Sequence, residues 1–181
     1  MTSADPGGGQ TLITPVMREW VGSTAPPLTS PPISESDIRR AAIAIYWPEV
    51  PPRLYWDAEH AAQTRWGGVI APEEFNPFAW MIGRAHVGPQ PDRVDEQQDA
   101  LEDARSLRPP GAPPRFLFGG VESSYGARMR PGDVITSLIT ATDLYERAGR
   151  LGPMLFYITE ETWTNQSGEI VKTTRTTNIA W

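Results

Sequence analysis

Residues 153–181 read PMLFYITEETWTNQSGEIVKTTRTTNIAW, and this stretch decides the class of fold. It contains two long runs that are rich in β-branched and aromatic residues and partly alternate, as strands do. Between the runs, Asn165-Gln166-Ser167-Gly168 is a turn signal with a glycine placed for positive φ. The stretch therefore predicts two antiparallel strands joined by a hairpin.

Two earlier segments have the same β-rich composition. They are residues 116–129, FLFGGVESSYGARM, and residues 133–149, DVITSLITATDLYERAG. The sequence Arg130-Pro131-Gly132-Asp133 joins them and is a second turn signal. Because helix signals dominate the half that precedes these runs, we expect an α+β fold in which one antiparallel sheet packs on a helix.

The helix signals begin at Ser34, which stands three residues before Asp37 as in a capping box. The apolar residues that follow fall on one helical face: Ile38, Ala41, Ala42 and Ile45. Pro48 ends this helix, since proline cannot continue one. A second, short helix is expected to begin at Asp57, an N-cap acid, and to end before Gly67-Gly68.

A third helix is expected within residues 69–84, VIAPEEFNPFAWMIGR. Pro72 suits its first turn, and Glu73 and Glu74 suit the positive end of the helix dipole. Pro77 lies inside the segment and would kink the helix or delay its start.

Composition narrows the class of protein. A chain of 181 residues is long enough for one domain with its own core, and we assign residues 11–181 to it and residues 1–10 to a disordered leader. The absence of cysteine excludes disulfides and thiolate chemistry. The net charge of −6 argues against a nucleic-acid partner. The sequence shows no secretory signal and no membrane span, so a cytoplasmic protein is expected.

The segment 51–72 carries the most specific motifs. It contains PPRLYWD at 51–57, HAA at 60–62 and TRWGGVIAP at 64–72. With RPGDVI at 130–135 and NQSGEIV at 165–171, these motifs resemble the MaoC-like hydratases and dehydratases. The likeness is greatest to the N-terminal, fatty-acid-synthase-like dehydratase subtype. The resemblance implies a hotdog fold, in which an antiparallel sheet wraps around a central helix.

The same resemblance implies chemistry on an acyl thioester carried by coenzyme A or an acyl carrier protein, without a cofactor or metal. Catalytic relatives activate water with an Asp/His dyad. Here Glu49 stands near the Asp position and Tyr55 at the His position, and unperturbed tyrosine is a poor base at neutral pH. We therefore expect an acyl-binding subunit that lacks the usual dyad and pairs with another hotdog subunit in a homo- or heterodimer.

Other residues are candidates for a displaced site. Asp57 and His60 are three residues apart and would share a helical face as an acid/base pair, although Asp57 as N-cap and His60 as a half-exposed helix residue is the simpler interpretation. Glu73 stands where relatives place an oxyanion donor, and Gly68 precedes it in the turn. With Tyr55 and Trp80 these residues form the expected substrate-binding set. Core packing is the alternative for both aromatics.

Rival functions remain open at this point. They are a homodimeric hotdog enzyme with a displaced acid and base, acting as a dehydratase, cyclase or thioesterase, and a non-enzymatic module that binds acyl or polyketide groups. Fold alone does not decide between them.

Overall fold

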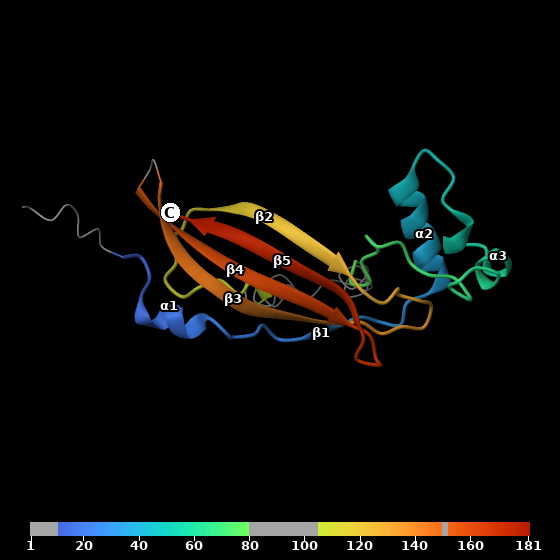
Figure 1. Ribbon diagram of the computed structural model, residues 1–181, viewed down its shortest axis with the longest axis horizontal. Helices are drawn as coiled ribbons and strands as arrows, with labels where there is room; N and C mark the ends of the chain where they lie inside the picture. The colour runs from blue at the N-terminus through green and yellow to red at the C-terminus, as the bar shows by residue number, and fades with distance from the viewer. Residues whose placement is uncertain (1–10, 80–104, 150–151) are drawn as a thin grey trace, which may run out of the picture.

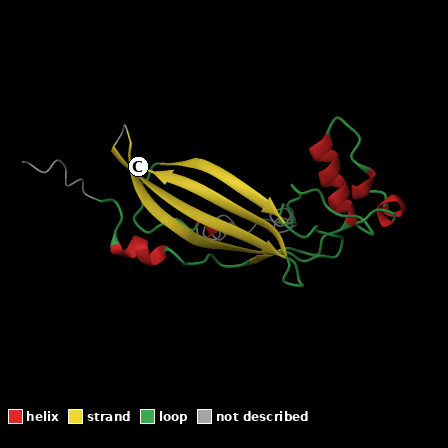
Figure 2. Cartoon of the chain, viewed as in Figure 1, coloured by secondary structure: helices red, strands yellow, loops and turns green. Residues whose placement is uncertain are grey.

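The sheet has five strands, all antiparallel to their neighbours. The computed structural model describes residues 11–79, 105–149 and 152–181, so the expected leader at 1–10 lies outside the described residues. In sheet order the strands are β1 (Leu28–Thr29), β3 (Thr136–Gly149), β4 (Gly152–Thr164), β5 (Ile170–Ala180) and β2 (Phe116–Tyr125). This curled sheet with few helices is a hotdog fold, as expected (Figures 1 and 2).

Both predicted turns are present. Gly168 has φ 79° in the β4–β5 hairpin, and the side-chain oxygen of Asn165 accepts hydrogen bonds from the backbone N–H groups of Ser167 and Glu169. In the turn before β3, Gly132 has φ 89° and the carboxylate of Asp133 accepts from the N–H of Arg130. The side chains therefore fix the connections that set the strand register.

The two faces of the sheet differ in chemistry. Strand β4 places Leu155, Tyr157 and Trp163 on one face, and all three are buried. On the opposite face, Arg175 of β5 stands in register between Glu160 of β4 and Glu122 of β2. Alternation along the strands thus places these core residues on one face, which we call the inner face, and the charges around Arg175 on the outer face.

The helices lie at the two ends of the sheet (Figure 1). Helix α1 (Pro15–Trp20) packs near the β3–β4 hairpin. Helix α2 (Glu35–Tyr46), the 3-10 turn η1 (Arg53–Tyr55) and helix α3 (Ala58–Ala62) form a lobe beyond the other end. We call this the helical lobe.

The predicted starts of the first two helices are confirmed. The hydroxyl of Ser34 accepts from the N–H of Asp37, and the carboxylate of Asp57 accepts from the N–H of His60. Ile38 and Ala42 are fully buried, whereas Ile45 is 45% exposed, so the apolar face of α2 is narrower than the sequence suggests.

The expected third helix is wrong for the part that the structure describes. Residues 69–79 form turns, in which Phe75 donates to the carbonyl of Pro72 and Ala79 donates to that of Asn76. The Asn76 side chain also accepts from the N–H of Phe78, which holds a turn instead of a helix. Residues 80–84 of the expected helix lie outside the described residues.

Two apolar clusters attach the ends of the molecule to the sheet. Near α1, Met17 and Trp20 pack against β3, β4 and β5. At the other end a larger cluster joins the helical lobe to the sheet: Ile33, Ile38, Ala61, Val69, Ala71, Phe75, Met129, Ile135, Trp163 and Val171. This second cluster positions the lobe and its loops over the strand ends.

Replacing Ser34 by alanine tests the cap of α2. The change removes the acceptor for the Asp37 N–H, and we expect the free energy of unfolding to fall by about 1 kcal/mol. Chemical denaturation measures the loss. The control is Ser167→Ala in the β4–β5 turn, where the hydroxyl has no bond within the described chain and stability should change little. An equal effect of both substitutions would contradict the assignment.

Candidate functional site

The loop 66–71 is fastened to the segment between β2 and β3. The N–H of Ala71 donates to the carbonyl of Met129 at 2.8 Å, and Arg128 donates to the carbonyl of Ala71 at 2.9 Å. Arg130 donates to the carbonyl of Trp66 at 2.7 Å. These bonds place the motif residues of 51–72 against the end of the sheet.

Tyr55 lies inside this arrangement, on η1. Its side chain is half-buried against the apolar cluster, and its hydroxyl oxygen lies 3.4 Å from that of Tyr46, with the ring centroids 5.8 Å apart. Burial raises the pKa of Tyr55, the hydrogen bond with Tyr46 raises it further, and the Arg128 guanidinium acts in the opposite direction. Tyr55 therefore keeps its proton at neutral pH and can donate a hydrogen bond, but it cannot serve as a base.

Glu73 and Glu74 bind the sheet end instead of beginning a helix. Arg128 forms an ion pair with Glu73, while the Tyr125 hydroxyl donates to Glu74 and Lys172 lies 3.8 Å from it. The expected role of Glu73 at a helix N-terminus has no support in the described residues, because its charge is compensated by Arg128. Glu73 therefore does not place an uncompensated negative charge beside the loop.

The candidate catalytic residues Asp57, His60 and Glu49 are not part of the group formed by Tyr55, Arg128 and Glu73. Both oxygens of Asp57 are occupied, one by the His60 N–H and the other by the Arg53 guanidinium at 2.7 and 2.9 Å. The bond from the His60 N–H and then the bond from Arg53 lower the pKa of Asp57. Glu49 is exposed in the loop after α2, and no hydrogen bond to its side chain is present in the described part of the chain.

The remaining predicted residues have different outcomes. Gly68 lies beside Arg130, whose Nη1 would be 3.8 Å from an added Cβ, so this glycine is not required by packing. Gly67 has φ 65° and supplies the turn. Trp80 lies outside the described residues.

Four residues of this site were not identified from the sequence, and they are Arg128, Arg130, Tyr125 and Lys172. Arg128 and Arg130 are two positions apart in the GARMR segment, just before the predicted turn, and that spacing was the available signal. Their contacts with Trp66 and Ala71 depend on tertiary pairing. Tyr125 and Lys172 face each other across β2 and β5, with the ammonium 5.2 Å from the tyrosine ring, and this pairing follows from strand register.

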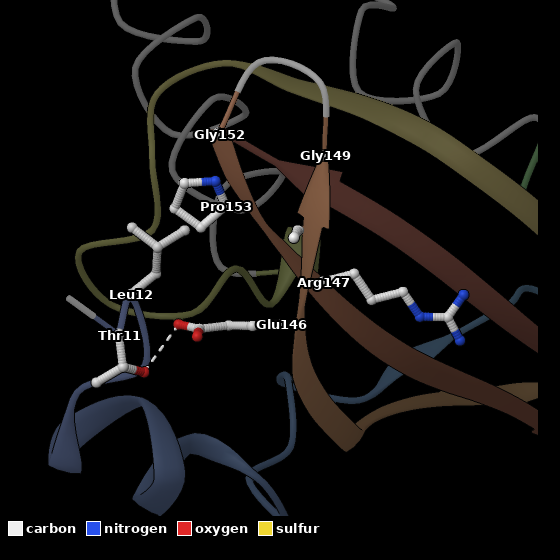
Figure 3. Close-up of a pocket in the computed structure, with 8 residues that line it drawn as sticks. Thr11, Leu12, Glu146, Arg147, Gly149, Gly152 and Pro153 are labelled. Carbon is white, nitrogen blue, oxygen red and sulfur yellow. Dashed lines mark hydrogen bonds between the residues drawn. The ribbon is translucent and has the colours of Figure 1, made fainter. Parts of the chain in front are cut away.

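A cavity of about 950 Å³ lies at the opposite end of the sheet (Figure 3). It is lined by the ends of β3 and β4 and by Thr11 and Leu12. Glu146 already accepts from the Thr11 hydroxyl at 2.9 Å and from the Ile13 N–H at 2.7 Å, and Arg147 points away from the cavity. The polar groups here secure the N-terminal arm, so we place the functional site at the helical lobe.

Among the described residues, no set of three or more His, Asp or Glu side chains is arranged to hold a metal ion. None of the helices in the same residues has the length and apolar character needed to cross a membrane.

The hydrogen bond between Tyr125 and Glu74 predicts a raised pKa for the Tyr125 hydroxyl. That bond and burial raise the pKa of Tyr125 to about 12, because phenolate would form beside a carboxylate. Glu74→Gln removes the charge, so the pKa of Tyr125 should fall toward about 10. NMR of labelled tyrosine rings follows the change, with Glu59→Gln on α3 as the charge-matched control. Titration of Tyr125 near 10 in the unsubstituted protein would refute the contact.

The comparisons agree with this architecture. Residues 19–174 match the family described as "FAS1-like, dehydratase domain region". No curated protein matches the chain by sequence. The fold resembles that of the (R)-hydratase PhaJ1 from Pseudomonas aeruginosa, with a TM-score of 0.54 at 18% identity, covering 88% of this chain and 81% of that one.

Two further structures show the same fold. A MaoC-like dehydratase from Rhodospirillum rubrum has a TM-score of 0.53 at 18% identity, covering 89% of this chain and 92% of that one. A chain of the ChsH1-ChsH2 complex from Mycobacterium tuberculosis has a TM-score of 0.62 at 17% identity, covering 92% and 94%. With a family match over most of its length, the chain belongs to the FAS1-like dehydratase family, and it shares its fold with the (R)-hydratase and the MaoC-like dehydratase.

Proposed function

We propose that this chain is the acyl-binding half of an enoyl-thioester hydratase, or 3-hydroxyacyl-thioester dehydratase, and that a second hotdog subunit supplies the Asp/His dyad. The observation that carries the proposal is Tyr55. It stands where catalytic relatives are expected to have histidine, and its raised pKa keeps the phenol protonated. A group that holds its proton at neutral pH cannot activate water.

The hydration reaction has three chemical requirements, and the described residues of this chain do not meet all of them. Hydration of the double bond needs a base for water, an acid for the α-carbon and a donor for the enolate-like oxygen. The Tyr55 hydroxyl suits the binding of a carbonyl, since it can donate a hydrogen bond. Asp57 is committed to the α3 cap and to Arg53, which favours its structural interpretation over a displaced dyad with His60.

The outer edge of the sheet supports a partner. Strand β2 pairs with β5 on one side, and no described strand covers its other side. Phe116, Phe118 and Val121 stand on the inner face of β2 and are 59%, 62% and 54% exposed. An unpaired edge beside exposed apolar side chains favours pairing with another sheet. The ChsH1-ChsH2 relative is itself a complex, in agreement with this role.

The proposed substrate is an acyl thioester on coenzyme A or an acyl carrier protein, with no further cofactor. We propose a cytoplasmic heterodimer with a dyad-bearing hotdog subunit as the working form. A homodimer belongs to the alternative in which this chain carries a displaced acid and base.

The test separates the chain from its partner. The chain is purified alone and with the hotdog subunit that copurifies from its native host, and hydration of crotonyl-coenzyme A is followed by loss of absorbance of the conjugated thioester. We expect hydration only in the complex. In that complex Tyr55→Phe should raise KM more than it lowers kcat, because it removes a binding contact and leaves the dyad intact.

Activity of the purified chain alone would contradict the proposal. If Asp57→Asn or His60→Ala then abolished that activity, the displaced pair would be the catalytic one. Release of free coenzyme A without hydration would indicate a thioesterase. Binding of the thioester without turnover in either preparation would indicate a non-enzymatic module.

A further inference from the structure

Three arginines surround Trp66 in the loop that leads away from α3. The guanidinium of Arg65 lies 4.5 Å from the centre of the Trp66 ring, and that of Arg128 lies 5.8 Å from it. Arg130 donates to the Trp66 carbonyl. Two guanidiniums therefore lie over the Trp66 ring and a third binds the Trp66 backbone carbonyl, and they come from two segments that are more than sixty residues apart in sequence.

The charge of this cluster is only partly compensated. Arg128 is largely buried, with 15% of its side chain exposed, and is paired with Glu73. Arg65 and Arg130 are exposed, and within the described chain no carboxylate lies at ion-pair distance from either. Two positive charges without a carboxylate partner in the described chain thus contact the same residue, Trp66, one at its ring and one at its carbonyl, on a protein whose net charge is −6. An anion that bound both guanidiniums would gain a charge-assisted hydrogen bond from each.

Both exposed guanidiniums are held in place. Arg65 stacks on the Trp66 ring, a contact that restricts its side chain. Arg130 is tied to the Trp66 carbonyl, and its backbone N–H donates to Asp133 in the turn. A preorganised guanidinium loses less freedom on binding an oxyanion, and its planar N–H groups match the oxygens of phosphate.

The position of the cluster is suited to a thioester. Arg128 connects it to Tyr55, which we propose contacts the acyl end, and to Ala71. Gly68, which stands between the arginines and the 71–79 turn, leaves the backbone open beside Arg130. Arg65, Arg128 and Arg130 thus all contact Trp66, and Arg128 links this residue to Tyr55.

We infer that Arg65 and Arg130, oriented by Trp66, bind the phosphate groups of the thioester's carrier. This inference rests on the proposed function, because it gives the thioester its second point of attachment. The phosphate could come from the adenosine 3′,5′-bisphosphate part of coenzyme A or from the phosphopantetheine of a carrier protein, which share this chemistry.

Binding of coenzyme A to the full chain, alone and in its complex, tests the inference by calorimetry at several salt concentrations. For Arg65→Gln and Arg130→Gln we expect affinity to fall about tenfold each, the loss of one charge-assisted contact, with a shallower dependence on salt. Trp66→Leu should weaken binding less. The charge-matched control is Arg18→Gln on α1, at the far end of the sheet, which should leave affinity unchanged.

Two probes distinguish the sources of phosphate. Binding of adenosine 3′,5′-bisphosphate that depends on Arg65 and Arg130 assigns the site to coenzyme A, whereas dependence with 4′-phosphopantetheine alone assigns it to a carrier arm. Equal affinities of the two variants and the control, with both probes, would overturn the inference. That result leaves the proposed function intact if the complex still hydrates crotonyl-coenzyme A. Arginine-dependent binding without hydration in any preparation would instead refute the proposed function alone.

Discussion

The functional part of this molecule depends on the attachment of the 66–71 loop to the segment that joins β2 and β3. Three hydrogen bonds make the attachment, and the side chains of Arg128 and Arg130 provide two of them. The apolar cluster that contains Met129 and Ala71 partly shields the two bonds of Ala71 from water, whereas the bond from Arg130 to Trp66 is exposed. Without this attachment the helical lobe would be joined to the sheet by the apolar cluster and by the backbone bonds of Ile33 with Gly132 and Asp133, and Tyr55 would lose its charged neighbour.

The attachment also explains how acidic and basic side chains are distributed. Glu73 and Glu74 are drawn to Arg128, Tyr125 and Lys172 at the sheet end, so their charges are used in fastening the 71–79 turn. Arg65 and Arg130 are left facing solvent. Positive charge without a carboxylate partner in the described chain therefore stands on the exposed side of this group, while Arg128 beside Tyr55 is paired with Glu73. This distribution suits a ligand with an anionic end and an uncharged thioester.

Much of the fold could be predicted from the sequence, because local signals and the fold agree. The alternation in 153–181, the turn glycines and the caps at Ser34 and Asp57 each act within a few residues. The helix within 69–79 failed because Pro72 and Asn76 favour turns whose backbone groups bind elsewhere. The site was harder to predict than the fold. The motif at 51–72 located Tyr55 and Gly68, but Arg128 reaches this segment only through tertiary contacts between residues far apart in sequence. Whether Asp57, His60 or Glu49 has any catalytic part stays a prediction.

The exposed edge of β2 is the feature of the fold that suits the proposed pairing with a catalytic subunit. Its apolar inner-face residues stay more than half exposed, and a partner sheet would supply both further cover and hydrogen-bond partners for the unpaired edge. Hydrogen–deuterium exchange of the chain, alone and with its copurifying subunit, tests this directly. The account predicts that the amides of Phe116–Tyr125 gain protection in the complex. Unchanged exchange there, with new protection on α1 or over the outer face around Arg175, would contradict it.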